Sequence, residues 1–254
     1  FEASSIRKIG GKYYFIYSSW QNHELCYATS DLPDRDFVFG GTIVSNGDVG
    51  YHGRSEKDRL NMTGTTHGSI ECINGQWYVF YHRLTHKSDY SRQACAEPIT
   101  ILPDGSIPQV EITSCGLNGK PLHGTGTYPA VIACNITNGH MPHGSNKIYT
   151  DSFPNATHCG EDRFIGEIQD GTMLGYKYFA FSGAKEIGVQ YRGSCNGKFV
   201  VSDDMDGKNI VAEIPVAPAD AWTESRAPLH ISDGTHPLYL FYRGDGEAAV
   251  KELY

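Results

Sequence analysis

Hydrophobic and polar residues alternate with a period of two through two matching stretches of the chain. Residues 5–17, SIRKIGGKYYFIY, form the pattern of a strand, a Gly-Gly turn and a second, aromatic-rich strand. Residues 69–81, SIECINGQWYVFY, repeat this pattern around an Asn-Gly turn, at an offset of 64 residues (69 − 5) and without a gap. Such dipeptides supply the positive φ angles that tight hairpins need. The sequence therefore predicts two related β-hairpins.

Each predicted hairpin is followed by two further strand-like runs. These are HELCYATS and FVFGGTIVS after the first hairpin, and RQACAEPITIL and PQVEIT after the second. Four antiparallel strands per repeat are typical of a β-propeller blade, whereas a bare duplicated hairpin is the alternative. The first strands of neighbouring blades lie around the central axis. Because the repeat aligns Glu2 with Thr66 and Ala3 with His67, we expect Glu2 and His67 to lie near each other.

The second half of the chain returns to short strand patterns after a region rich in Gly, Asn, Pro and His. That region, 113–147, is interpreted as a connector with one short strand at 130–134. Six runs with turn signals between them then predict a β-sandwich of the jelly-roll kind. They are 163–171, 174–181, 185–193, 197–204, 209–216 and 236–244. The prediction is an all-β chain with domains at 1–140 and 141–254.

Charge and composition exclude two classes of partner. The formal net charge is −8, and Lys and Arg form no cluster of the kind that a nucleic-acid backbone requires. No apolar stretch approaches the roughly 20 residues that span a bilayer. We therefore expect neither a nucleic acid nor a membrane as partner.

Several histidines lack the spacing of a metal site. His82 and His86 in YHRLTH are four residues apart, which on a strand puts both on one face without a metal cage. His123, His140 and His143 are irregularly spaced in a Gly-rich region. All five are interpreted as loop or surface residues.

Three motifs resemble glycoside hydrolase family 43, the five-bladed propeller β-xylosidases and α-L-arabinofuranosidases. They are FEASSIRKIGGKYYFIYSS, TTHGSIECINGQWYVFYHR and SRQACAEPI, within about residues 1–130. The resemblance implies that 1–140 holds the last blades of a propeller and that the activity is inverting hydrolysis of β-1,4-xylosides or α-L-arabinofuranosides. It also implies xylan or arabinoxylan oligosaccharides as partners and an extracellular or periplasmic location.

The resemblance implies roles for particular residues. Glu2 matches the family's general acid, whose pKa an apolar, carboxylate-crowded pocket would raise; a solvated terminal glutamate is the alternative. His67 matches the axial histidine near a central cation, with calcium as the expected cofactor, and Arg92 matches a substrate contact. A structural histidine and a surface strand arginine are the alternatives for these two. Trp20 is a candidate sugar-stacking wall, and packing is its alternative.

One departure from the family concerns the remaining carboxylates. In the family, the general base and the carboxylate that tunes the acid both precede the acid in the chain, whereas here only Phe1 precedes Glu2. Inversion needs a second carboxylate about 6.5–9.5 Å across the substrate. We therefore expect these residues to be the C-terminal part of a longer enzyme and to be inactive alone.

The second half resembles a family 6 carbohydrate-binding module. The motifs are DGTMLGYKYFAFSGAKEIGVQYRG, GKFVVSDDMDGKNIVAEIPV and DGTHPLYLFYRGDG. Such modules hold sugar between aromatic rings, and Trp222 is the candidate here, with a core position as the alternative. Met173 stands where the family often has an aromatic residue. A non-catalytic protein that binds plant polysaccharides is the alternative function for the whole chain.

Overall fold

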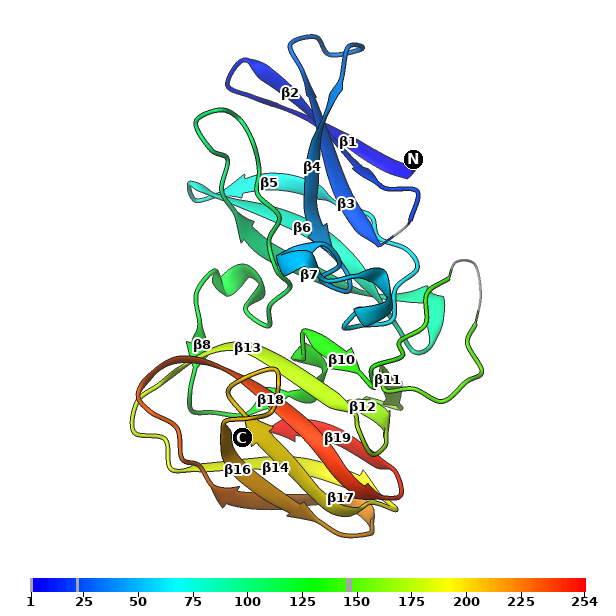
Figure 1. The fold of residues 1–254 in the computed structure, drawn as a ribbon, viewed down its shortest axis with the longest axis vertical. Helices are drawn as coiled ribbons and strands as arrows, with labels where there is room; N and C mark the ends of the chain where they lie inside the picture. Colours follow the sequence, from blue (N-terminus) through cyan, green and yellow to red (C-terminus); the bar gives the residue numbers. More distant parts are fainter. Residues whose placement is uncertain (1, 22, 145–147) are drawn as a thin grey trace. The chain divides into compact units, whose positions relative to one another are not determined.

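The computed structural model describes residues 2–21, 23–144 and 148–254, except for the side chain of Glu2. The chain divides into two compact units, Phe1–Ile112 with Pro142–Tyr149, and Thr113–Met141 with Thr150–Tyr254. Both are built from strands, which confirms the all-β prediction (Figure 1). Residues 113–140, which the predicted domains 1–140 and 141–254 place in the first domain, lie in the second unit. In the described part of the chain, no helix is long and apolar enough to cross a bilayer.

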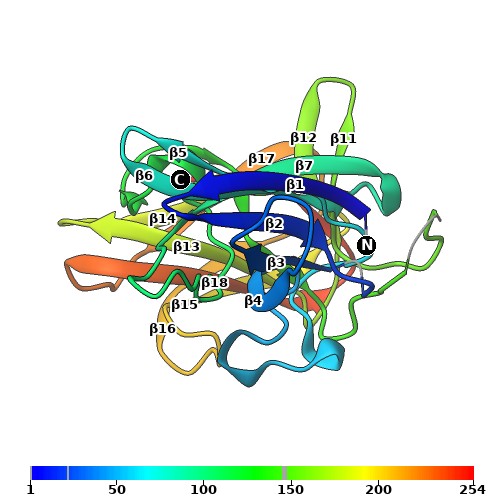
Figure 2. The same ribbon diagram turned by 90° about the horizontal axis from the view of Figure 1, so that it is seen from above.

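The first unit begins with a four-stranded antiparallel meander in sequence order (Figure 2). Its hairpin closes at the predicted Gly-Gly turn, where Ile9 pairs with Lys12 and Gly10 has a φ of 60°. Alternate residues of the second strand, such as Tyr14 and Ile16, are buried. The strands are β1 (Glu2–Ile9), β2 (Lys12–Ser18), β3 (Glu24–Ser30) and β4 (Val38–Ser45).

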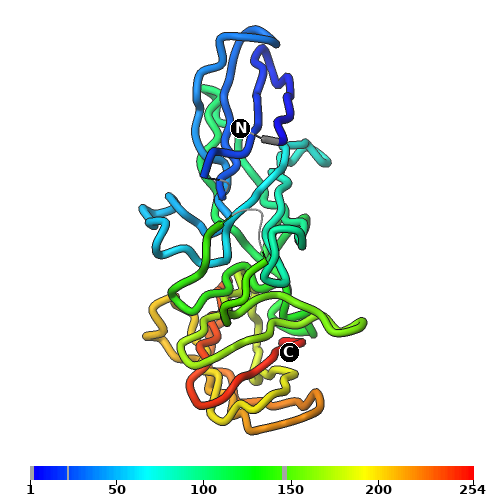
Figure 3. Tube along the Cα trace, turned by 90° about the vertical axis from the view of Figure 1, so that its right-hand side faces the viewer, coloured from blue at the N-terminus to red at the C-terminus, as the bar shows by residue number. Residues whose placement is uncertain are grey.

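A three-stranded antiparallel meander follows it along the chain. Its trace is the cyan to blue-green part of the tube in Figure 3. Its strands are β5 (Ser69–Ile73), β6 (Gln76–Thr85) and β7 (Ser88–Ile99). The predicted fourth strand at 108–113 is wrong. The Val110 N–H donates to the Ile43 carbonyl at 2.8 Å, and the Ile112 N–H donates to Asp48 Oδ1 at 2.9 Å. Residues 110–112 therefore run beside the end of β4 and the residues just after it, and they do not extend the second meander. Two 3₁₀ turns, Tyr51–Gly53 and Glu56–Asp58, lie between the meanders in sequence.

The second unit is a sandwich of two sheets, of which one is antiparallel and the other contains the parallel pair β8–β13, and this confirms the predicted β-sandwich. The sheet orders are β10-β13-β18-β15-β16, with β8 beside β13, and β11-β12-β19-β14-β17, with β9 beside β19. All six predicted runs are strands, listed with the others: β8 (Leu122–His123), β9 (Tyr128–Pro129), β10 (Asn135–Thr137), β11 (Asn155–Cys159), β12 (Asp162–Ile168), β13 (Met173–Phe181), β14 (Glu186–Gly193), β15 (Asn196–Ser202), β16 (Ile210–Val216), β17 (Ala219–Pro228), β18 (Gly234–Asp245) and β19 (Ala248–Leu253).

The region interpreted as a connector is part of the sandwich. It contributes β8, β9 and β10 to the two sheets, and 3₁₀ turns at Gly116–Asn118 and Ala130–Ile132. The strand predicted at 130–134 is therefore wrong. Ala130 and Ala133 are fully buried, and the Tyr176 hydroxyl donates to the Ala130 carbonyl at 3.1 Å, so this turn closes over the core.

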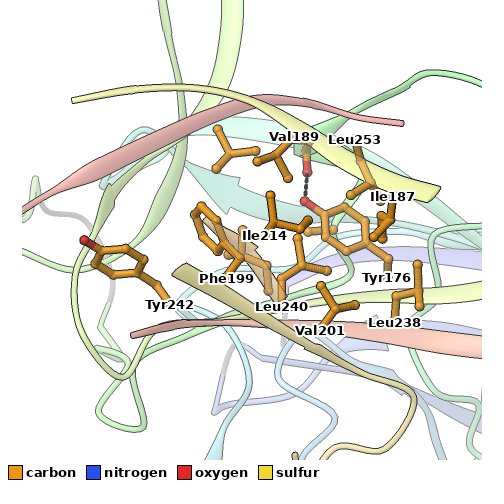
Figure 4. Close-up of a cluster of buried hydrophobic side chains, with 14 of the residues drawn as sticks. Tyr176, Ile187, Val189, Phe199, Val201, Ile214, Leu238, Leu240, Tyr242 and Leu253 are labelled. Atoms are coloured by element: carbon orange, nitrogen blue, oxygen red, sulfur yellow. Dashed lines mark hydrogen bonds between the residues drawn. The ribbon is translucent and has the colours of Figure 1, made fainter. Parts of the chain in front are cut away.

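Aromatic and β-branched side chains from both sheets fill the sandwich core (Figure 4). Phe199 and Tyr242 pack with ring centroids 5.4 Å apart, and neither ring is accessible to solvent. Val189 and Leu240 approach from the two different sheets. Burial of this apolar surface on both inner faces holds the unit together.

Candidate functional site

The first strands of the two meanders lie side by side. The Ser5 hydroxyl donates to the Ser69 hydroxyl at 2.8 Å, and Arg7 Nε lies 3.4 Å from Glu71 Oε2. Both pairs are separated by the 64 residues of the sequence repeat, so β1 and β5 run in matching register and begin at the same end. This is the side-by-side arrangement that the repeat predicts.

Glu2 begins β1 at this end, where its backbone pairs with Ser18. A β-bulge between Glu2 and Ser5 follows, with Ala3 at a φ of 47°. Bulges of this kind re-aim side chains and are frequent beside active sites. The side chain of Glu2 lies outside the described part of the structure, so its role as general acid stays a prediction.

His67 lies at the entrance to β5, in contact with a second histidine. The His67 N–H donates to His82 Nδ1 at 3.3 Å, and the two rings meet edge to face with centroids 5.3 Å apart and planes 81° apart. His82 Nε2 lies 3.3 Å from the Thr65 hydroxyl. Because Nδ1 accepts a hydrogen bond, the proton of the neutral ring is on Nε2.

Arg92 and His82 share one face of the β6–β7 hairpin. His82 pairs with Ala94 and Leu84 pairs with Arg92, so His82 and Arg92 are two positions apart along the ladder. Burial, then the Arg92 charge and then His67, lower the pKa of His82 to about 4. The Arg92 side chain is exposed, and its Nε donates to the Asp89 carbonyl at 3.2 Å.

His82 is a functional candidate that the sequence analysis missed, because the interpretation as a loop or surface residue is wrong. β6 continues to Thr85, and the chain turns at His86 and Lys87, both at a φ of 54°. This turn contains neither Gly nor Asn, so the sequence carries no signal for it.

His143 is exposed, as its interpretation as a solvated residue expects, but it makes specific contacts. Its Nδ1 lies 2.9 Å from the Thr63 hydroxyl, and its ring meets His23 edge to face at 5.4 Å. Burial, followed by His23, lowers the pKa of His143. These contacts join 142–149 to the first unit and do not place His143 in the His67 cluster.

Calcium, expected from the family resemblance, prefers six to eight oxygen ligands. The neighbours that the structure gives His67 and His82 include imidazole and guanidinium nitrogens, which are unsuited to calcium. Among the described residues, no group of three or more His, Cys, Asp or Glu side chains is arranged to hold a metal. The described side chains do not fit a calcium cage, and calcium stays a prediction.

The two tryptophan candidates lie in different units. Trp20 follows β2 and is 80% exposed. In the sandwich, Trp222 Nε1 donates to Asp162 Oδ2 at 2.8 Å, and the Arg192 guanidinium lies 4.4 Å from the centre of the Trp222 ring. Phe164 meets the same ring at 5.4 Å. One face of Trp222 is thus occupied by a cation, and the sugar-binding roles of both tryptophans stay predictions.

A hollow of about 490 Å³ opens in the sandwich beside Trp222. Trp222 does not line it, although its neighbours Phe164 and Arg192 do. Met173 is buried in the core rather than placed at this hollow. Half of the lining residues are polar or charged, namely Thr157, Glu167, Arg192, Ser194, Asp220 and Glu247.

Comparison with known proteins gives relatives along the whole chain. No family model matches the chain. A xylosidase/arabinosidase of Thermoclostridium stercorarium is 46% identical over 267 residues, which cover 100% of this chain and 55% of the relative. The chain thus spans about half the length of that curated relative.

Two crystal structures are similar to all or to half of the chain. One is a glycoside hydrolase family 43 arabinoxylan arabinofuranohydrolase from Bacillus subtilis in complex with cellotetraose, with a TM-score of 0.48 and 18% identity, covering 100% of this chain and 53% of that one. The other is a family 6 carbohydrate-binding module from Clostridium cellulolyticum in complex with xylose, with a TM-score of 0.42 and 15% identity, covering 50% of this chain and 94% of that one.

Proposed function

We propose that this chain is part of a glycosidase of the family 43 type and serves hydrolysis of β-1,4-xylosides or α-L-arabinofuranosides in xylan. The 46% identity over the whole chain is the observation that carries this proposal. The geometry of the first unit supports it, because β1 and β5 begin together and His67, His82 and Arg92 gather at this part of the unit.

The reaction we propose is inversion at the anomeric carbon. Glu2 protonates the leaving glycosidic oxygen, and a second carboxylate removes a proton from the attacking water. Arg92 donates hydrogen bonds to sugar hydroxyls through its planar fork. Among the described contacts of His67 and His82, the charged or ring partners are imidazole and guanidinium groups, and no carboxylate is assigned as the base. We therefore propose that the 254-residue chain alone does not complete hydrolysis.

The test compares the 254-residue chain with the protein expressed from its complete reading frame. Both are assayed on 4-nitrophenyl β-D-xyloside and 4-nitrophenyl α-L-arabinofuranoside. We expect turnover only from the complete protein and a loss of about 10²- to 10⁴-fold for Glu2→Gln. Lys8→Gln, an exposed change further along the same strand, is the matched control. Comparable turnover by the chain alone, or full activity of Glu2→Gln, contradicts the proposal.

A second candidate function, binding of xylan oligosaccharides by the sandwich, is favoured by the hollow beside Trp222. Affinity electrophoresis of the full chain in soluble arabinoxylan tests it. Thr157→Trp fills the hollow and should abolish retardation, and Trp222→Ala should weaken it if the ring contacts sugar. Equal retardation of wild type and Thr157→Trp would exclude the hollow as the site.

We also propose that the protein acts outside the cytoplasm, in the periplasm or the medium. Polymeric xylan is too large to enter cells, and this supports the proposal. Immunodetection in culture medium, periplasm and cytoplasm tests it, and a purely cytoplasmic signal contradicts it.

A further inference from the structure

Three consecutive residues before β5 are bonded to one histidine. Thr65 contacts His82 Nε2 through its hydroxyl, the Thr66 hydroxyl donates to the His82 carbonyl at 3.3 Å, and the His67 N–H donates to His82 Nδ1. Thr66 is only 1% exposed, so its bond is shielded from water. The Asn46 side chain adds a bond to the Thr65 carbonyl at 3.0 Å. The entrance to β5 is thus fixed against β6 mainly through His82.

The bond from His67 requires a specific form of the His82 ring. Nδ1 must be unprotonated to accept the His67 N–H, and Nε2 must carry the hydrogen that it donates to Thr65. Burial and the facing Arg92 and His67 favour this neutral form. The segment 65–67 therefore requires a hydrogen-bond acceptor at the position of His82 Nδ1.

We propose that His82 is a positioning residue that orients the His67 backbone and imidazole at the substrate-facing end of β1 and β5. The hydrogen bond fixes the backbone of His67, and the edge-to-face ring contact fixes the plane of its imidazole. The functional consequence rests on the proposed glycosidase activity, because it requires His67 to face the sugar. The positioning itself does not depend on that activity.

Two substitutions at position 82 separate the acceptor from the side-chain volume. Asn places its amide oxygen near the position of Nδ1, whereas Gln reaches toward the position of Nε2 and leaves the His67 N–H without its acceptor. His86→Asn is the matched control, because His86 is a nearby turn residue and Asn tolerates its positive φ. Thermal unfolding of each variant confirms that the first unit is folded.

The primary readout is hydrogen exchange of the His67 amide in the 254-residue chain, measured by NMR. We expect protection to fall about tenfold or more in His82→Gln, and to stay within about threefold of wild type in His82→Asn and His86→Asn. If a position-82 variant fails to fold, Thr65→Val, which removes the partner of Nε2, should still lower protection severalfold. Unchanged His67 protection in His82→Gln, or in Thr65→Val where that variant replaces it, overturns the proposal.

The second readout is kcat/KM of the protein from the complete reading frame. We expect at least a tenfold loss in His82→Gln, with most of the activity recovered in His82→Asn. Reduced protection together with unchanged kcat/KM overturns the role of His82 at the substrate. Reduced protection in a protein that hydrolyses neither glycoside leaves the positioning of His67 supported and contradicts only the proposed function.

Discussion

The two units share the same alternation of residues but use it differently. In the sandwich, two sheets cover each other's apolar faces, and Phe199, Leu240 and Tyr242 are fully buried between them. In the β1–β4 meander, one face carries buried residues such as Ile16, while the other retains exposed apolar side chains. Alternation predicts strands equally well in both cases. It does not reveal whether a second layer covers the apolar face.

The open face of the meander carries an apolar row across its four strands, which is exposed at its two ends and buried at Ala28. Ile6 pairs with Phe15, Phe15 with Ala28, and Ala28 with Phe39, so all four side chains point to the same side. Ile6 is 42% exposed and Phe39 is 63% exposed. Apolar residues gathered in this way differ from the scattered exposed hydrophobics that are normal on proteins.

The largest expected effect comes from truncating a phenylalanine on each side of this comparison. Phe199→Ala removes a fully buried ring and should lower the free energy of unfolding of the second unit by about 3–5 kcal/mol. Phe39→Ala removes an exposed ring and should cost less than about 1 kcal/mol. Calorimetry of the full chain measures both. Equal shifts for the two variants, or a shift of the first unit's transition by Phe199→Ala, would contradict the comparison.

The two units should also lose stability in different pH windows. The pKa of His82 is lowered from 6.5 to about 4 in the folded first unit, so the unfolded state binds more protons between these values. The first unit should therefore lose stability as the pH falls from about 6.5 to 4. Since the ring is only partly buried, we expect a loss of about 1–2 kcal/mol.

In the second unit, the Lys251 ammonium and then the Trp222 indole lower the pKa of Asp162 below 3.8 by hydrogen bonding. This contribution is present above pH 3.8 and disappears as the pH falls through the lowered pKa. Unfolding curves between pH 7 and pH 3 measure both windows. His82→Gln should reduce the loss of stability of the first unit between about pH 6.5 and 4. Asp162→Asn should reduce the loss of stability of the second unit below pH 3.8. If both units lose stability over the same pH range and neither variant changes this, His82 and Asp162 do not determine the pH dependence of stability.

The smallest effect concerns dye binding to the open face. The 254-residue chain should bind 1-anilinonaphthalene-8-sulfonate at neutral pH while folded, because the row around Phe39 is accessible. Phe39→Ser should reduce the fluorescence by roughly half, with Val38→Ser, an exposed neighbour on β4, as the matched control. Identical fluorescence of wild type and Phe39→Ser would mean that the dye binds elsewhere.

The sequence predicts hairpins where turn chemistry is explicit and misses strands where it is not. The turns at Gly10 and Gly75 mark β1–β2 and β5–β6 correctly. By contrast, β17 (Ala219–Pro228) is exposed at most positions, so it carries no apolar alternation to recognise. Residues 108–113 look like a strand, yet their partners Ile43 and Asp48 are distant in sequence.

In the candidate site, the sequence predicts that β1 and β5 begin together, but it does not predict the contact between His82 and His67. The repeat brings the entrance residues of β1 and β5 together, as the Ser5–Ser69 contact shows. The sequence does not indicate the place of His82, because the register of β6 and β7 depends on a turn without Gly or Asn. Its partnership with His67 follows from that register and not from any motif.

The most direct test of the account is a disulfide between the aligned serines of β1 and β5. Hydroxyls 2.8 Å apart occupy positions that two sulfur atoms can bridge, so Ser5→Cys with Ser69→Cys should cross-link on mild oxidation, with the 5–69 peptide found by mass spectrometry. The control is Ser5→Cys alone. It should remain unlinked, because the natural Cys72 lies three residues beyond Ser69, the residue that contacts Ser5. Efficient formation of the disulfide between positions 5 and 69 supports the arrangement in which β1 and β5 begin side by side. Its absence, or preferential bonding to Cys72, would contradict the register on which the site depends.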